Sequence, residues 1–145
     1  MAVELIEAAS PELAAAFAAL IPQLSRSSKP MDLEQLESFL AQENIYLFGY
    51  FSSADGERKM LGMLTLVTFE IPTGWRAWIE DVVVDEAARG QGAGQQLVEA
   101  AIEMAQKVGA KSLDLTSRPA REAANRLYQR CGFTMRETNI YRYQG

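Results

Sequence analysis

Hydrophobic and polar positions follow two periods along the chain, one typical of strands and one typical of helices. Apolar residues at positions 97, 98, 101, 104, 105 and 108 recur at helical spacing. Residues 77–84 are almost continuously apolar, as in a central strand covered on both faces. The pattern predicts strands over 3–8, 45–51, 60–69, 77–84, 111–116, 133–135 and 140–143, and helices over 11–24, 32–40, 97–108 and 123–131. This order indicates a mixed α/β fold.

Polar residues and glycines mark where these elements begin and end. Ser10-Pro11-Glu12 combines an N-cap residue, a proline at the first helical position and an acidic residue in the first turn. Asp32 and Gln35 stand at the spacing of a capping box. Ala54-Asp55-Gly56 predicts the turn of an antiparallel hairpin. The glycines placed to end the last two helices are Gly109 and Gly132.

Length and composition are those of one ordinary globular domain, residues 1–145. Apolar residues make up 48% of the chain and charged residues 23%, a balance that argues against disorder. No apolar run approaches the roughly 20 residues of a membrane span, and the start Met1-Ala2-Val3-Glu4 lacks the pattern of a signal peptide. Cys131 is the one cysteine, so we expect a reducing cytoplasm.

The sequence contains no histidine, which limits the metal sites and catalytic mechanisms that it can form. It excludes zinc fingers and every mechanism with a histidine base, and we expect no metal site. The net charge of −5 disfavours a general nucleic-acid binder. Residues 118–145 nevertheless carry six arginines against two glutamates, so the basic end is either a local anion site or a counterweight in salt bridges.

A glycine-rich run lies between the strand 77–84 and the helix 97–108. It reads Asp85-Glu86-Ala87-Ala88-Arg89-Gly90-Gln91-Gly92-Ala93-Gly94. Glycines at alternate positions let backbone N–H groups converge on an anion, and the helix dipole and Arg89 add positive potential. The glycines by themselves fit a flexible turn equally well. The G-x-G-x-x-G spacing of a dinucleotide site is absent, as is the P-loop lysine.

Two motifs together resemble the GNAT superfamily of acyl-CoA-dependent N-acyltransferases. Arg89, Gly92 and Gly94 match the superfamily's Q/R-x-x-G-x-G/A pyrophosphate loop, after the expected strand and before the expected helix. A second segment looks like the family's segment in which an asparagine and a tyrosine precede Gly-Phe. It reads Asn125-Arg126-Leu127-Tyr128-Gln129-Arg130-Cys131-Gly132-Phe133. The resemblance spans the whole chain and is weakest over residues 1–60.

The resemblance implies a fold and an acyl donor. The fold is a mixed, mostly antiparallel sheet, splayed between the fourth and fifth strands and flanked by about four helices. The donor is acetyl-CoA, whose pantetheine arm fills the splay as a pseudo-strand. By motif position, the pantetheine arm would lie against the backbone of Val82, Val83 and Val84. The implied pyrophosphate turn is Arg89, Gly90, Gln91, Gly92, Ala93 and Gly94, and Asn125 matches a position that contacts the CoA arm.

Tyr128 matches the tyrosine that in many family members faces the sulfur of CoA. A phenol there can protonate the departing thiolate, because it is a donor with a pKa near 10. The alternative is a tyrosine that packs in the core beside Leu127 and Cys131. The resemblance favours the catalytic role.

Glu80 and Asp81 are two acids in an otherwise apolar strand, where charge is costly unless it is paired or used. Successive strand residues face opposite sides, so both line one pocket only if a bulge intervenes. Because an ammonium must lose a proton before it attacks, a carboxylate or a water held by one is the available base. Glu80 is the first candidate and Asp81 the second. A buried ion pair with an arginine explains them nearly as well.

The sequence therefore predicts an N-acetyltransferase that moves an acetyl group from acetyl-CoA directly to a primary amine. Glu80, Asp81 and Asp114 near the expected pocket favour a cationic small-molecule acceptor over a long protein tail or a nucleic acid. No membrane partner is expected. Glucosamine-6-phosphate N-acetyltransferases are one alternative, because residues 80–84 and 127–133 look much like the corresponding segments of those enzymes. A non-catalytic acyl-CoA sensor is the other, and a homodimer stays open.

Overall fold

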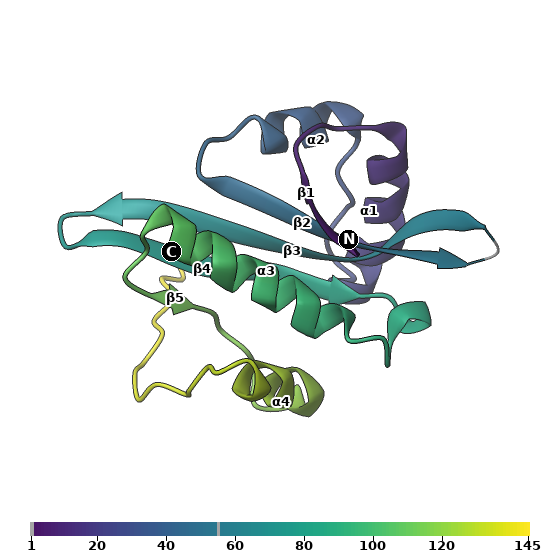
Figure 1. The fold of residues 1–145 in the computed structure, drawn as a ribbon. Helices are drawn as coiled ribbons and strands as arrows, with labels where there is room; N and C mark the ends of the chain where they lie inside the picture. Colours follow the sequence, from purple (N-terminus) through teal and green to yellow (C-terminus); the bar gives the residue numbers. More distant parts are fainter. Residues whose placement is uncertain (1, 55) are drawn as a thin grey trace.

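The computed structural model describes residues 2–54 and 56–145. A five-stranded sheet in the order β1-β2-β3-β4-β5 runs through the molecule, with helices on both sides (Figure 1). The strands are β1 Val3–Ile6, β2 Ile45–Ala54, β3 Glu57–Ile71, β4 Gly74–Val84 and β5 Leu113–Asp114. The helices are α1 Pro11–Leu24, α2 Leu33–Leu40, α3 Ala93–Val108 and α4 Glu122–Arg130, with the short 3₁₀ helix η1 at Glu86–Ala88. The predicted mixed α/β fold is confirmed.

The first four strands are antiparallel neighbours, and only β5 runs parallel to its partner, β4. The parallel pairing follows from the crossover through α3, which returns the chain to the same end of the sheet. The predicted hairpin joins β2 to β3, although Asp55 in its turn lies outside the described residues.

Alternation along the strands divides the core into two clusters, one on each face of the sheet. On β3, Met63 packs with α1 and α2, whereas its neighbour Leu64 packs with α3. On β2, Leu47 and Phe48 divide in the same way. The sheet is therefore covered on both faces, which explains why its central strands are so apolar.

The predicted helix caps are present. Ser10 Oγ accepts a hydrogen bond of 3.1 Å from the Leu13 N–H at the start of α1. Asp32 and Gln35 form a reciprocal capping box at α2, with hydrogen bonds of 2.8 and 2.9 Å. Gly132 has φ 99° just beyond α4, and the next N–H bonds back to the Tyr128 carbonyl at 2.9 Å. This closure is a Schellman motif.

Four predicted elements need correction. The helix expected at 97–108 already begins at Ala93, because left-handed Gly92 starts it. The strand expected at 111–116 is paired only at Leu113–Asp114. Neither 133–135 nor 140–143 forms a strand, since a two-residue β5 gives them almost no edge to pair with. This end of the chain exposes its large apolar side chains, which are Met135, Ile140, Tyr141 and Tyr143.

Candidate active site

The sheet opens between β4 and β5. The two strands pair only where Ala77 meets Leu113 and Trp78 meets Asp114. Beyond that point β4 continues to Val84, paired with β3 on one side and, among the described residues, with no strand on the other. The backbone of Ile79–Val84 therefore presents hydrogen-bonding groups along the opening, and such groups need a partner when water is excluded. This splay is where the resemblance placed it.

A β-bulge bends β4 within the opening. Val83 pairs with Met63 and Glu80 with Thr65, so β4 has one residue more than β3 in this interval. The strain is taken by Asp81, whose φ of 49° lies in the left-handed region that most side chains avoid. The bulge interrupts the alternation of side chains between faces, which is the condition for Glu80 and Asp81 to serve the same side.

Both carboxylates are exposed, which corrects part of the sequence interpretation. Glu80 and Asp81 were expected to be costly in a central strand, but the opening and the bulge leave them in solvent. The ion pair recorded among the described residues joins Arg58 to Glu4 and involves neither. A buried ion pair with an arginine is therefore wrong for these two residues. Solvated carboxylates remain available to accept a proton.

The glycine turn leads from η1 into α3, and its glycines have two different tasks. Gly90 and Gly92 have φ of 84° and 75°, which glycine adopts without strain. Open space surrounds a Cβ built on Gly90, and one on Gly92 would meet only the Gln96 amide at 3.9 Å. A Cβ on Gly94 would instead lie 2.9 Å from Leu127, so this glycine lets α4 pack closely on α3.

The first turn of α3 points free donors at the glycine turn. Gly92, its N-cap residue, has no side chain to accept from the N–H groups, and the first turn carries no acidic residue. The first helical hydrogen bond runs from the Gln96 N–H to the Gly92 carbonyl at 3.0 Å. The preceding N–H groups and the positive end of the helix dipole are thus arranged as in sites that bind phosphates.

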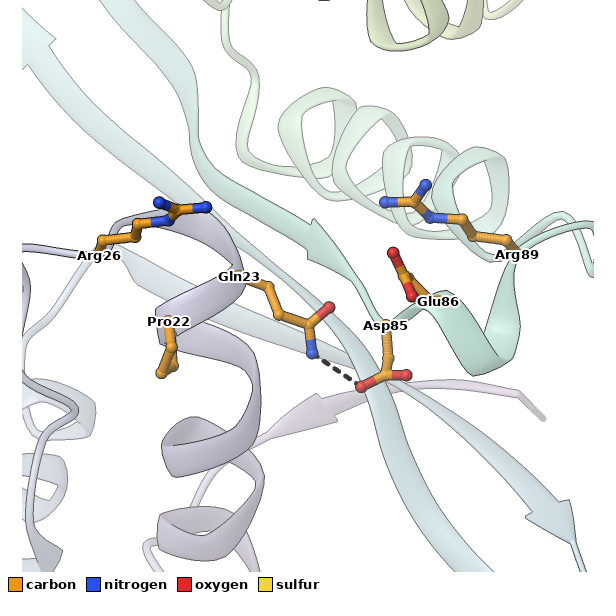
Figure 2. Close-up of a pocket in the computed structure, with 6 residues that line it drawn as sticks. All are labelled: Pro22, Gln23, Arg26, Asp85, Glu86 and Arg89. Carbon is orange, nitrogen blue, oxygen red and sulfur yellow. Dashed lines mark hydrogen bonds between the residues drawn. The ribbon is translucent and has the colours of Figure 1, made fainter.

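Two contacts that the sequence did not reveal hold this turn in place. The buried Tyr50 of β2 donates a 3.0 Å hydrogen bond to the Gln91 carboxamide oxygen. Gln23 of α1 donates a 2.9 Å hydrogen bond to Asp85, the residue between β4 and η1 (Figure 2). Both contacts join residues far apart in the chain, and no local pattern marks such pairs. They fix the turn against β2 and α1.

Asp85 is held as a carboxylate. Its other oxygen accepts a 2.9 Å hydrogen bond from the Ala87 N–H and so caps η1. This backbone bond, followed by the bond from Gln23, lowers the pKa of Asp85 below its ordinary value. The group therefore stays ionised throughout the neutral range.

Tyr128 lies in α4 beside the start of α3. Its side chain is 8% exposed and belongs to the same core cluster as Ala93 and Leu97. Its ring meets Phe133 edge to face, with the centroids 6.1 Å apart. Burial raises the pKa of Tyr128 above its ordinary value, so the phenol keeps its proton at neutral pH. The ring packs in the core as the alternative interpretation requires, and the protonated hydroxyl suits an acid.

Asn125 is committed to the loop before α4. Its Nδ2 donates hydrogen bonds to the carbonyls of Arg118 and Arg121, at 3.0 and 2.9 Å. In this way it holds the loop that connects the diverging end of β5 to α4. Its predicted contact with the CoA arm stays a prediction.

The structure thus gathers most of the predicted residues around one opening. Val82, Val83 and Val84 run directly into Asp85 and the glycine turn, and Leu127, the neighbour of Tyr128 on α4, lies against Gly94. Glu80 and Asp81 lie further back along β4, at the bulge. Within residues 2–54 and 56–145, no cluster of three or more potential metal ligands is found. None of the described helices is long and apolar enough to span a membrane.

Comparison with known proteins agrees with this arrangement. The model of a family described as the acetyltransferase (GNAT) family matches residues 13–133. The chain belongs to the GNAT acetyltransferase family. Its resemblance to that family, and the splayed GNAT fold with four α-helices, are therefore confirmed.

Individual relatives of this GNAT chain support the same assignment. It is 32% identical to the uncharacterized N-acetyltransferase YhdJ of Bacillus subtilis (strain 168) over 111 residues, which are 76% of this chain and 75% of that protein. A solved structure from Agrobacterium tumefaciens str. C58, named as a candidate acetyltransferase, is 26% identical with a TM-score of 0.80, covering 99% of this chain and 100% of that one. Glucosamine-6-phosphate N-acetyltransferase from Arabidopsis thaliana shares the fold, with 18% identity, a TM-score of 0.76 and coverage of 99% and 98%.

Proposed function

We propose that this GNAT chain is an N-acetyltransferase that moves an acetyl group from acetyl-CoA directly to a primary amine of a small molecule. The observation that carries the proposal is the continuity of two features. The unpaired edge of β4 runs directly into a glycine turn with free N–H donors at the start of α3. An extended amide chain that ends in phosphates matches both features, and CoA has that form.

The residues present fit CoA. The unpaired backbone of Val82, Val83 and Val84 would hold the amides of the pantetheine arm in place of a neighbouring strand. The turn Arg89–Gly94 would hold the diphosphate, since Gly90 and Gly92 leave the space around their α-carbons open. On the α4 side of the opening, Asn125 would contribute by holding the loop before α4 in place.

Acetyl-CoA supplies an activated acyl thioester when bound. The residues around it accept and donate the protons that the reaction moves. Glu80, or Asp81 beside it, accepts the proton that the acceptor ammonium must lose before its nitrogen attacks the acyl carbon. A backbone N–H of Val82–Val84 polarises the carbonyl. As the carbon–sulfur bond breaks, Tyr128 donates its proton to the thiolate, and the raised pKa keeps that proton available. The nitrogen loses its second proton to solvent as the amide forms, and the phenol regains a proton from solvent.

The charged side chains near the opening indicate which class of acceptor binds there. The exposed Glu80 and Asp81 favour a cationic amine, while the arginines of residues 118–142 suit an anionic group on the same molecule. A small amine with an anionic group elsewhere fits better than a protein tail or nucleic acid. The likeness in fold to glucosamine-6-phosphate N-acetyltransferase keeps an amino sugar phosphate as the alternative acceptor. Cytoplasmic location and a homodimer stay predictions.

A panel of amines tests the proposed function. Amino sugars, amino acids, polyamines and peptides would each be mixed with acetyl-CoA and the chain, and thiol release would be followed. We expect turnover with at least one small amine. Turnover with peptides alone would contradict the choice of acceptor. Tight acetyl-CoA binding without turnover on any amine would favour the sensor.

The base is tested by Glu80→Gln. We expect this variant to lose about 10²-fold in turnover near neutral pH, because the acceptor then arrives protonated. The loss should shrink at high pH, where the amine is already deprotonated. The paired variant is Asp81→Asn at the neighbouring position of the bulge, which should show this pH-dependent loss in place of Glu80→Gln if Asp81 is the base. A pH–rate profile of Glu80→Gln that runs parallel to the wild-type profile would exclude Glu80 and leave Asp81 or water.

A further inference from the structure

A surface pocket lies between the C-terminal end of α1 and the segment that joins β4 to the glycine turn (Figure 2). Its volume is about 420 Å³. Its lining residues are Pro22, Gln23, Arg26, Asp85, Glu86 and Arg89. The pocket adjoins the turn through Arg89, yet its other wall comes from α1, to which neither of the two family motifs extends.

Two guanidinium groups face each other across this pocket. Arg26 follows the end of α1, and Arg89 caps η1 at the start of the glycine turn. In Figure 2 their head groups point toward one another from opposite walls. Both side chains are exposed, and neither takes part in the ion pair recorded among the described residues. Asp85 and Glu86 also line the pocket and balance these two charges, so an anion there would be held by the guanidinium N–H donors.

A hydrogen bond at the floor of the pocket joins its two walls. Gln23, on the last turn of α1, bonds to Asp85 at 2.9 Å and so ties the Arg26 wall to the Arg89 wall. One carboxylate oxygen of Asp85 accepts this bond, and the other accepts a hydrogen bond from the Ala87 N–H. Glu86 is the second carboxylate of the lining, and Figure 2 places it between Asp85 and Arg89. Like the ionised Asp85, it repels an anion in the pocket, so its replacement tests whether an anion binds there.

We infer that Arg26 and Arg89 together bind a phosphate group of CoA, with Arg26 as a second cationic ligand from outside the glycine turn. The inference rests on the proposed function. Guanidinium groups bind phosphate through planar, paired N–H donors, and two of them can take opposite oxygens of one group. The α1 end thereby becomes part of the donor site. A phosphate or carboxylate on the acceptor has the same chemistry, and the experiment separates the two sources.

Arg26→Ala is the decisive variant, and Lys29→Ala is its control, because it removes an equal charge from the same loop but not from the pocket lining. Calorimetry would measure binding of acetyl-CoA, and displacement would measure binding of S-acetylpantetheine, which carries no CoA phosphates. We expect Arg26→Ala to bind acetyl-CoA about 5- to 10-fold more weakly, the size of one ordinary net hydrogen bond. Its affinity for S-acetylpantetheine, and both affinities of Lys29→Ala, should stay at the wild-type level.

Glu86→Gln has the opposite expected sign. Removal of the opposing charge should tighten acetyl-CoA binding about 2- to 3-fold, in keeping with one exposed charge pair. Equal losses for both donors in Arg26→Ala, or no loss for either, would overturn the inference. So would a raised acceptor KM with unchanged acetyl-CoA affinity, since the anion would then belong to the acceptor. If the wild-type chain does not bind acetyl-CoA, the proposed function itself fails, which is a different result.

Discussion

Gly92→Glu is expected to abolish acetyl-CoA binding while the chain remains folded. Gly92 has φ 75°, and a side chain there lies in open space near the Gln96 amide. The strain of a glutamate in this left-handed conformation is about 1–2 kcal/mol, which is small beside the stability of a domain. A carboxylate at the start of α3 interacts favourably with the helix dipole, so the helix should persist. The same carboxylate occupies and repels the place where the diphosphate is proposed to bind.

Calorimetric titration with acetyl-CoA measures the binding, and thermal unfolding followed by circular dichroism checks the fold. Gly109→Glu is the matched control, because Gly109 has φ 86° and open space at the other end of the same helix. This control should be the less stable of the two variants, since its charge meets the negative end of the dipole, and it should bind acetyl-CoA normally. Wild-type affinity in a folded Gly92→Glu protein would exclude the glycine turn as the donor site.

Tyr128→Phe is expected to lower turnover about 10²-fold, the size of general acid catalysis, with little change in acetyl-CoA affinity. Phenylalanine keeps the ring and its edge-to-face contact with Phe133, so the core around α4 should be retained. The sign of the pH effect follows from the raised pKa of Tyr128. The protonated phenol is the active form, so wild-type activity should fall only as pH rises above the ordinary tyrosine pKa of about 10. That alkaline fall should be missing in Tyr128→Phe.

Steady-state kinetics and a pH–rate profile provide these measurements. Tyr50→Phe is the control, because it removes a hydroxyl that holds Gln91 in the glycine turn. It should weaken acetyl-CoA binding and leave the rate at saturating donor unchanged. Unaltered turnover in Tyr128→Phe would remove this phenol from the chemistry. A fall in rate matched by a fall in melting temperature would support the core-packing interpretation.

The sequence predicted features whose causes are local. The caps of α1 and α2 depend on residues three positions apart, and the glycine turn on one short run of sequence. The splay came from the family resemblance and not from periodicity. The bonds from Tyr50 to Gln91 and from Gln23 to Asp85 join distant segments, so no pattern of spacing announces them.

The failures also have physical causes. Apolar residues at 133–135 and 140–143 have the composition of strands, but a strand needs a neighbouring edge, and β5 is paired over only two residues. Glu80 and Asp81 were expected to be buried because the strand around them is apolar. Their exposure instead depends on the bulge and on the lack of a paired strand along this part of β4. In both cases the outcome is decided by pairing across the sheet.

The close approach of Gly94 to Leu127 has a consequence for how related sequences vary. A methyl group at position 94 would lie 2.9 Å from a terminal methyl of Leu127, so either the Leu127 side chain turns aside or α4 moves. Tyr128 is the next residue along α4, so a movement of α4 would also displace the phenol. Chains with alanine at the position of Gly94 should therefore carry a smaller side chain at the position of Leu127. The two positions should vary together in size, which links the geometry of the donor turn to the placement of the acid.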